Sequence, residues 1–217
     1  MIGIYNYTVV VTYLSLVSAG IGMYLSAHGS FKAALFCMLL SGLCDMLDGP
    51  IARTKDRTET EKKFGIQIDS LCDCVSFCVQ PAVFVYFVSY YATDSSVIQT
   101  IGLAGGIVFA LCGVIRLAYF NVTEEERQQT EGNKKRTGYQ GLPVTNASLI
   151  VPMFFLTRYF LNGAAFAILM IVVLMIIAFL FVYNFNMFKL HGKKLIPVGI
   201  IGLLMFIGII FAPSGVI

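Results

Sequence analysis

Seven long apolar segments, separated by short clusters of charge, constrain this chain more than any other feature. They cover approximately residues 8–27, 31–47, 66–91, 97–120, 144–161, 164–183 and 196–213. A helix needs roughly 17–25 predominantly apolar residues to cross a bilayer, and each segment is near or above that length. The segments do not show the alternating polarity of transmembrane β-strands. The sequence therefore predicts an all-α, polytopic transmembrane helical bundle.

Composition agrees with a membrane protein. Of the 217 residues, 58% are hydrophobic and 12% are charged, whereas a soluble domain is about 25% charged. The net charge of +3 is too small for a protein that binds nucleic acid through a basic patch, so no nucleic-acid partner is expected. No positively charged region precedes the first segment, so a cleaved signal peptide is not expected either.

The cationic residues predict the orientation. If all seven segments cross the membrane, twelve of the 15 lysines and arginines lie on the side of the N-terminus, and only Lys32 and Arg158 lie on the other. This asymmetry predicts a cytoplasmic N-terminus in the cell membrane. The twelve residues are Arg53, Lys55, Arg57, Lys62, Lys63, Arg127, Lys134, Lys135, Arg136, Lys189, Lys193 and Lys194.

Four aspartates at the predicted cytoplasmic ends of the second and third segments carry the functional signal. A carboxylate near hydrocarbon is costly unless it is paired or bound to a cation. Asp45 and Asp48 are three residues apart, and Asp69 and Asp73 are four apart, so each pair shares a helix face. Two antiparallel helices joined by one loop can bring these faces together.

Such a cluster predicts a site for divalent cations. Ligands that are all oxygen favour hard ions such as Mg²⁺, Mn²⁺ or Ca²⁺. Two such ions would make a clamp for phosphoryl chemistry. Gly49, Ala52 and Gly65 leave the backbone open beside the acids, and Arg53 offers a fork of donors for a phosphate. Alternatively, the glycines are close-packing positions and Arg53 is a topology anchor.

The arrangement of these residues resembles the signature of the CDP-alcohol phosphatidyltransferases, D-x2-D-G-x2-A-R followed by G-x3-D-x3-D. Here it reads Asp45-Met-Leu-Asp48-Gly49-Pro-Ile-Ala52-Arg53, then Gly65-x3-Asp69-x3-Asp73, with all eight fixed residues present. The spacer, residues 54–64, is longer than in the family pattern, and it lies in a polar loop where insertions are tolerated.

The resemblance implies a fold and an activity. It implies a six-helix transmembrane core, here residues 1–190, with residues 191–217 adding a C-terminal span. It also implies a homodimer with a two-metal site, holding Mg²⁺ or Mn²⁺, that is open to the cytoplasm. The family transfers a substituted phosphate from a CDP-linked donor to an alcohol and releases CMP.

The resemblance also implies residue roles. The four motif aspartates bind the metal ions, and Asp73 is the general base as well. Gly49, Ala52, Arg53 and Gly65 line the pocket for the CDP group.

Two further pieces bear on the acceptor alcohol. Arg116-Leu-Ala-Tyr-Phe-Asn121 and the Gly-Leu-Pro sequence at 141–143 are similar to the phosphatidylserine synthase branch of the family. This similarity implies CDP-diacylglycerol and L-serine as substrates, and Arg116, Lys135 and Arg136 as candidate contacts for the acceptor or a phosphate. The alternatives are a snorkelling anchor for Arg116 and a solvated loop for the other two. The glycine and proline are expected to shape the turn into the fifth segment.

Two other functions stay open at this point. One keeps the reaction but uses glycerol 3-phosphate or an inositol phosphate as the acceptor, which would need several basic residues at the site. The other is a divalent-cation transporter, in which acids usually lie at the membrane midplane between inverted repeats. Here the acids lie at one end of their segments and no internal repeat is found, which favours the transferase.

Overall fold

The computed structural model describes residues 3–131, 138–188 and 196–211. The first half of the described chain contains α1 (Tyr7–Ala27), α2 (Phe31–Ala52), α3 (Glu59–Asp73), the π-helix η1 (Cys74–Val79), α4 (Gln80–Ala92) and α5 (Ser96–Glu131). The second half contains β1 (Gly138–Gln140), η2 (Val144–Asn146), α6 (Ala147–Phe155), η3 (Leu156–Tyr159), α7 (Gly163–Val182), β2 (Asn186–Phe188) and α8 (Ile196–Phe211). The predicted all-α bundle is confirmed, with one two-stranded antiparallel sheet added to it.

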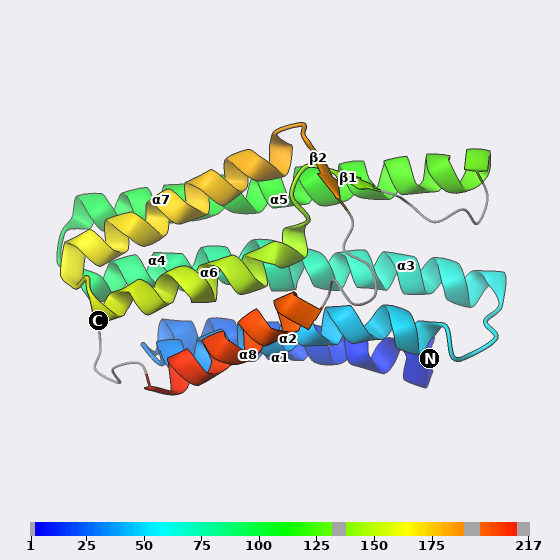
Figure 1. Cartoon of the computed structure of the whole chain (residues 1–217), viewed down its shortest axis with the longest axis horizontal. Coiled ribbons are helices and arrows are strands. Elements are labelled where there is room, and N and C mark those ends of the chain that lie inside the picture. The colour runs from blue at the N-terminus through cyan, green and yellow to red at the C-terminus, as the bar shows by residue number, and fades with distance from the viewer. Residues whose placement is uncertain (1–2, 132–137, 189–195, 212–217) are drawn as a thin grey trace.

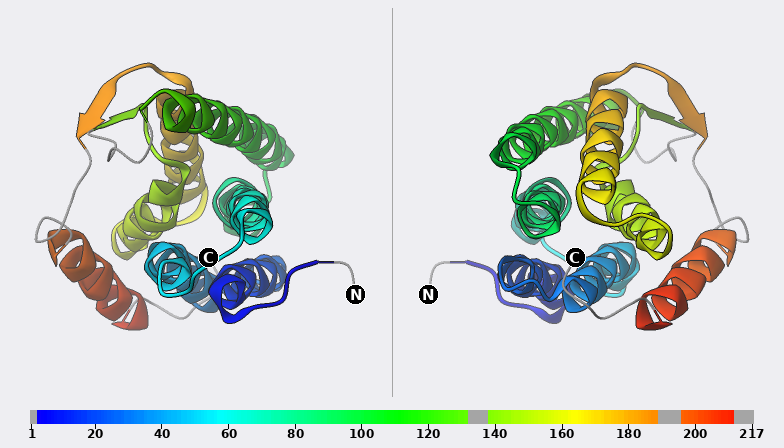
Figure 2. Two further views of the ribbon diagram at one scale, coloured as in Figure 1. Left: turned by 90° about the vertical axis from the view of Figure 1, so that its right-hand side faces the viewer. Right: turned by 90° about the vertical axis from the view of Figure 1, so that its left-hand side faces the viewer.

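The helices lie roughly along one long axis in three tiers (Figure 1). One tier holds α1, α2 and α8, the next holds α3, α4 and α6, and the last holds α5 and α7. The end views of Figure 2 show α8 at the edge of the bundle. It packs there through the rings of Phe36 and Phe206, whose centroids are 4.8 Å apart, and through a hydrogen bond from the Tyr159 hydroxyl to the Gly208 carbonyl oxygen.

Five helical stretches are long and apolar enough to cross a membrane: 7–27, 31–52, 59–92, 96–127 and 163–182. The chain is therefore an integral membrane protein. The other two predicted segments are helical but shorter. The segment at 144–161 is divided among η2, α6 and η3, and α8 has 16 residues.

Two helices continue beyond the apolar segments from which they were predicted. α3 begins at Glu59 and α5 ends at Glu131, so part of each charged stretch expected to be a loop is helical. Hydropathy marks where a helix leaves the bilayer, whereas the helix itself ends only where its backbone hydrogen bonds do. Figure 1 shows these extensions at the end of the bundle where α1 begins.

The start of α3 is built by a capping box. The Thr58 hydroxyl accepts a hydrogen bond from the Glu61 backbone N–H at 3.2 Å, and the Glu61 carboxylate accepts one from the Thr58 backbone N–H at 2.9 Å. Such reciprocal capping satisfies two N–H groups at a helix start. Glu61 also pairs with Lys55 at 3.0 Å and accepts from Asn6 at 3.1 Å. The loop between α2 and α3 is thereby tied to the beginning of α1.

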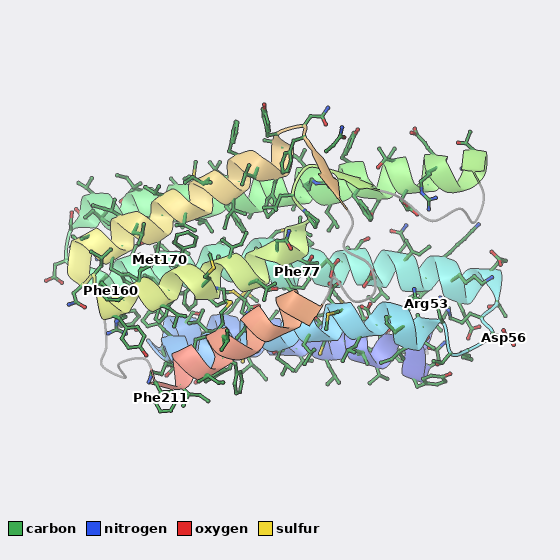
Figure 3. All side chains as sticks on the ribbon, viewed as in Figure 1. Arg53, Asp56, Phe77, Phe160, Met170 and Phe211 are labelled. Atoms are coloured by element: carbon green, nitrogen blue, oxygen red, sulfur yellow. The ribbon has the colours of Figure 1, made fainter. Side chains whose placement is uncertain are left out.

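Small residues hold α1 against α2. The Ser15 and Ser41 hydroxyls each donate to the other residue's backbone carbonyl oxygen, at 3.3 and 3.0 Å. Both serines are buried, and close approach with interhelical hydrogen bonds is the usual way in which helices associate in a bilayer. Large apolar side chains such as Phe77 and Met170 fill the interior between the tiers (Figure 3). Since α1 packs on both α2 and α3, it positions these two helices relative to each other, and with them the four aspartates.

Candidate active site

The ends of α2 and α3 bring three of the four motif carboxylates together. Asp45 and Asp48 lie one turn apart in α2, and Asp69 lies near the end of α3. Each offers one oxygen atom, and the three oxygens all lie within 4.8 Å of one another. Across the described ranges, no other group of three acidic, histidine or cysteine side chains converges in this way.

Asp73 lies one turn beyond Asp69 and outside this group of three. Its carboxyl group faces that of Asp45, just as Asp69 faces Asp48. The helix becomes the π-helix η1 immediately after Asp73, and π-helical turns are rare and frequent at functional sites. The Thr12 hydroxyl of α1 donates to Asp48 Oδ2 at 3.4 Å, so three helices contribute to the cluster.

These residues fit a divalent cation. Asp69 Oδ1 is buried and has no hydrogen-bond partner in the structure. A buried carboxylate oxygen without a partner is costly, and carboxylates that converge also repel one another. A hard cation bound by carboxylate oxygens removes both costs.

A cavity of about 230 Å³ opens beside the carboxylates. Asp45, Asp69 and Asp73 line it. The remaining lining comes from α3, from α5 and from the turn before α6, and includes Ser70, Arg116, Phe120, Asn121, Pro143 and Thr145. Pockets for drug-sized ligands have volumes of about 300–1,000 Å³, so this cavity suits a smaller molecule.

Arg116 enters the cavity from α5 and is only 5% exposed. Its Nε donates to the carbonyl oxygen of Leu142 at 3.1 Å, and its guanidinium carbon lies 6.0 Å from the centroid of the Phe120 ring. The side chain is buried within the protein, so the alternative of a snorkelling anchor is not what the structure shows. Its cationic group lies instead at the cavity that the aspartates share.

The Gly-Leu-Pro sequence forms the turn expected from it. Gly141 adopts the left-handed conformation with φ of +73°, which favours glycine. Its N–H donates to the Phe185 carbonyl oxygen at 2.7 Å, and the Leu142 N–H donates to the Leu180 carbonyl oxygen at 3.3 Å. Next to this turn, β1 pairs with β2, so the end of α7 holds the turn against the cavity.

The remaining motif residues lie in or near the loop between α2 and α3. Ala52 ends α2, and Arg53 is exposed just after it (Figure 3). A Cβ added at Gly49 would meet only the Arg53 guanidinium within 4 Å, at 3.8 Å. One added at Gly65 would meet only that of Arg57, at 3.2 Å. Both glycines therefore face space that is open except for a cationic side chain.

The sequence did not predict a site role for some residues that the structure places there. Two residues that it did predict lie outside the described ranges. Ser70 and Thr145 line the cavity although no sequence pattern indicated them. Asn121 also lines it, and the sequence stretch that ends at this residue gave it no role. Arg57 was counted only among the residues that set orientation, although its guanidinium lies over Gly65. Lys135 and Arg136, which were candidate contacts for the acceptor, lie outside the described residues.

Comparison with known proteins identifies the family. The family model for CDP-alcohol phosphatidyltransferase matches residues 5–182, which is most of the chain and includes every motif residue. The chain belongs to the CDP-alcohol phosphatidyltransferase family. This membership agrees with the carboxylate cluster as a site for a divalent metal and favours a transferase over a transporter.

Several curated proteins are similar to this chain. The archaetidylserine synthase of Methanothermobacter thermautotrophicus is 38% identical over 167 residues, covering 75% of this chain and 65% of the relative. The CDP-diacylglycerol–serine O-phosphatidyltransferases of Saccharomyces cerevisiae and Helicobacter pylori are each 34% identical. Those matches cover 60% and 59% of this chain, and 44% and 47% of the relatives. The chain thus spans less than two thirds of the length of each of these relatives.

Proposed function

We propose that this protein is a metal-dependent CDP-diacylglycerol–serine O-phosphatidyltransferase. One observation carries the proposal: the convergence of Asp45, Asp48 and Asp69 within 4.8 Å, beside a small cavity that holds a buried arginine. The names of the similar proteins support serine as the acceptor in both archaeal and other relatives. Since these names leave the lipid part of the donor open, an ether-linked donor is an alternative to diacylglycerol.

The four motif aspartates hold the metal ions in this proposal, and Mg²⁺ and Mn²⁺ both suit them. When bound, the ions supply positive charge at the pyrophosphate and stabilise CMP as a leaving group. Asp73 accepts the proton of the serine hydroxyl as that oxygen forms a bond to the phosphorus that carries the diacylglycerol. The bond between this phosphorus and the oxygen of CMP breaks, giving phosphatidylserine and CMP.

Arg116 orients the acceptor. It is the cationic side chain among the described residues that line the cavity, and it is buried. Arginine binds a carboxylate through charge-assisted hydrogen bonds, so it suits the carboxylate of serine. Glycerol 3-phosphate and inositol phosphates carry a phosphate, which has more negative charge than the carboxylate of serine, and they are larger molecules. A cavity of about 230 Å³ with Arg116 in its described lining therefore favours serine. Lys135 and Arg136 are proposed as further contacts for an anionic group.

The CDP group of the donor is proposed to lie over Gly49, Ala52 and Gly65, with Arg53 at its phosphates. The absence of side chains at the two glycines leaves room for the nucleotide. Because these residues lie outside the apolar segments 31–47 and 66–91 of the sequence, the nucleotide would be at the membrane surface while the lipid tails stay in the bilayer.

We also propose the orientation of the enzyme in the membrane, its domain boundaries and its oligomeric state. The cytoplasmic side of the cell membrane, with the N-terminus inside, is favoured by the described cationic residues in or beside the loop between α2 and α3, which are Arg53, Lys55, Arg57, Lys62 and Lys63. Residues 1–190 would form the catalytic domain and residues 191–217 an additional span. The resemblance to the family favours a homodimer.

Release of CMP by the purified protein tests the proposal. The assay contains CDP-diacylglycerol, Mg²⁺ or Mn²⁺, and one of L-serine, glycerol 3-phosphate, inositol, inositol phosphate or choline. We expect release with L-serine alone. Release only with another acceptor would overturn the choice of serine but keep the family chemistry, and metal uptake into proteoliposomes without a nucleotide lipid would favour the transporter instead.

A further inference from the structure

We propose that Asn121, held in place by Ser70, recognises the ammonium group of the acceptor and so selects an amino acid over simple alcohols. This inference rests on the proposed function, because it concerns how that enzyme would recognise its acceptor. Neither residue belongs to the motif of eight residues, and they come from different helices, Asn121 from α5 and Ser70 from α3.

The contact between them lies at the reactive centre. Asn121 Nδ2 donates a hydrogen bond to Ser70 Oγ at 2.8 Å, and both residues are half-buried in the lining of the cavity. Ser70 directly follows Asp69 and precedes Asp73 by three residues. Asp73, the carboxylate that is proposed to take the proton of the acceptor, lines the same cavity as Asn121 and Ser70.

The hydrogen bond determines which end of the amide remains available. An asparagine side chain has a donating NH₂ group and an accepting carbonyl oxygen. Since Nδ2 is engaged by Ser70, Oδ1 is left as an acceptor. An ammonium group donates three hydrogen bonds and accepts none, so it is complementary to this oxygen. The nearby carboxylates are assigned to metal binding and proton transfer, which leaves this neutral oxygen for the ammonium group.

Arg116 and Asn121 together would bind an amino acid at two points. They lie five residues apart on α5, about 7.5 Å along the helix axis, and both line the cavity. One side chain offers donors to a carboxylate and the other offers an acceptor to an ammonium group. An α-amino acid carries both groups on one carbon, so binding at both points fixes where its hydroxymethyl group points. Ethanolamine lacks one of these groups and 3-hydroxypropionate lacks the other.

The test compares two ligands of the acceptor site, L-serine and 3-hydroxypropionate, which differ by the ammonium group. CMP release by the whole protein in detergent is measured with CDP-diacylglycerol and L-serine, and 3-hydroxypropionate is added as a competing ligand. For Asn121→Ala we expect kcat/KM for L-serine to fall about 10- to 100-fold, the range for losing a hydrogen bond to a charged group. The KM for CDP-diacylglycerol and the inhibition constant of 3-hydroxypropionate should stay unchanged, because neither involves an ammonium group.

Two further variants separate recognition from folding. Asn162→Ala removes an exposed asparagine at the opposite end of the bundle and should behave as the unmodified protein. Asn121→Asp keeps an accepting oxygen, and the Ser70 hydroxyl can donate to its second oxygen, so kcat/KM for L-serine should fall less than in Asn121→Ala. If Asn121→Ala fails to fold, Asn121→Gln, which displaces the carbonyl by one methylene, should show the same selective loss for L-serine.

Each outcome has a distinct meaning. In Asn121→Ala, kcat/KM for L-serine and the affinity for 3-hydroxypropionate could fall by the same factor, or neither could fall. Either result would overturn the role of Asn121 while leaving the proposed function intact. If the unmodified protein releases CMP with another alcohol but not with L-serine, the proposed function fails and this inference fails with it.

Discussion

Arg116 Nε donates a hydrogen bond of 3.1 Å to the carbonyl oxygen of Leu142. This bond joins the middle of α5 to the turn that precedes α6, and both of these elements line the cavity beside the aspartates. The guanidinium group is therefore oriented by the backbone of the turn. In the proposed enzyme, this orientation presents its donors to the carboxylate of the acceptor.

Arg116→Lys tests that arrangement. Lysine keeps the charge but lacks the planar fork, so it cannot bond the Leu142 carbonyl oxygen and a carboxylate in the same geometry. We expect the KM for L-serine to rise about 10-fold or more, with little change in the KM for CDP-diacylglycerol. Steady-state CMP release with each substrate varied in turn measures both. Equal changes in the two constants would contradict a specific role in acceptor binding.

Gly141→Ala tests the turn itself. The left-handed conformation costs a residue with a Cβ roughly 1–2 kcal/mol. The added Cβ would also lie 3.2 Å from the Tyr183 carbonyl oxygen and 3.4 Å from Arg116 Nε. We expect a lower melting temperature in detergent and a higher KM for L-serine.

Gly20→Ala is the matched control for that variant. Gly20 is in the middle of α1, and an added Cβ there would meet nothing within 4 Å. Replacing a glycine inside a helix by alanine favours the helix by roughly 0.5–1 kcal/mol, so this variant should be as stable as the original or slightly more so. A melting temperature for Gly141→Ala equal to that of Gly20→Ala would contradict the structure of the turn.

Removing the metal tests whether the carboxylate cluster binds a cation, without relying on an activity measurement. A cation that binds only the folded state adds about 2.7 kcal/mol to the free energy of unfolding at 100 times its dissociation constant. We therefore expect Mg²⁺ or Mn²⁺ to raise the melting temperature of protein that has been stripped with a chelator. Asp69→Asn should abolish this rise, because it removes a ligand whose Oδ1 is otherwise unpartnered.

Asp56→Asn provides the comparison for that experiment. Asp56 is an exposed residue in the loop between α2 and α3, at the same end of the bundle (Figure 3). Its replacement changes the net charge by the same amount as Asp69→Asn does. A metal-induced rise that persists in Asp69→Asn, or that disappears in Asp56→Asn as well, would argue against a specific site.

The orientation in the membrane can be tested with single cysteines. Thr60, in the first turn of α3, and Asn162, before α7, are exposed at opposite ends of the bundle. In a variant whose six native cysteines are replaced, we expect a membrane-impermeant thiol reagent to label Asn162→Cys in intact cells. Thr60→Cys should be labelled only after the cells are opened. The reverse pattern would place the site on the outer face.

The aspartates could be predicted from sequence because their positions depend on helical periodicity alone. Asp45 and Asp48 share one face of α2, and Asp69 and Asp73 share one face of α3. One short loop joins the two helices, and both of them pack on α1, so the two faces meet. The turn at Gly141 could be predicted for a similar reason, since glycine and proline have strong local preferences.

The contact between Asn121 and Ser70 could not be predicted in this way. The two residues are 51 positions apart, and their contact depends on where α5 crosses α3. That crossing follows from the packing of α5 on α4 and α7, which no local pattern encodes. Asn121 also lies in a stretch that becomes charged soon after it. Hydropathy predicted the end of a span there, whereas the helix continues to Glu131.

The identity of the lipid product tests the central claim most directly. L-serine labelled with a radioisotope is incubated with the purified protein, CDP-diacylglycerol and Mg²⁺ or Mn²⁺, and the label that enters the lipid phase is compared with the CMP released. We predict that label and CMP appear in equal amounts, that both require the metal, and that both disappear in Asp73→Asn while Asp56→Asn retains them. Release of CMP without labelled lipid, or undiminished labelling in Asp73→Asn, would contradict the account.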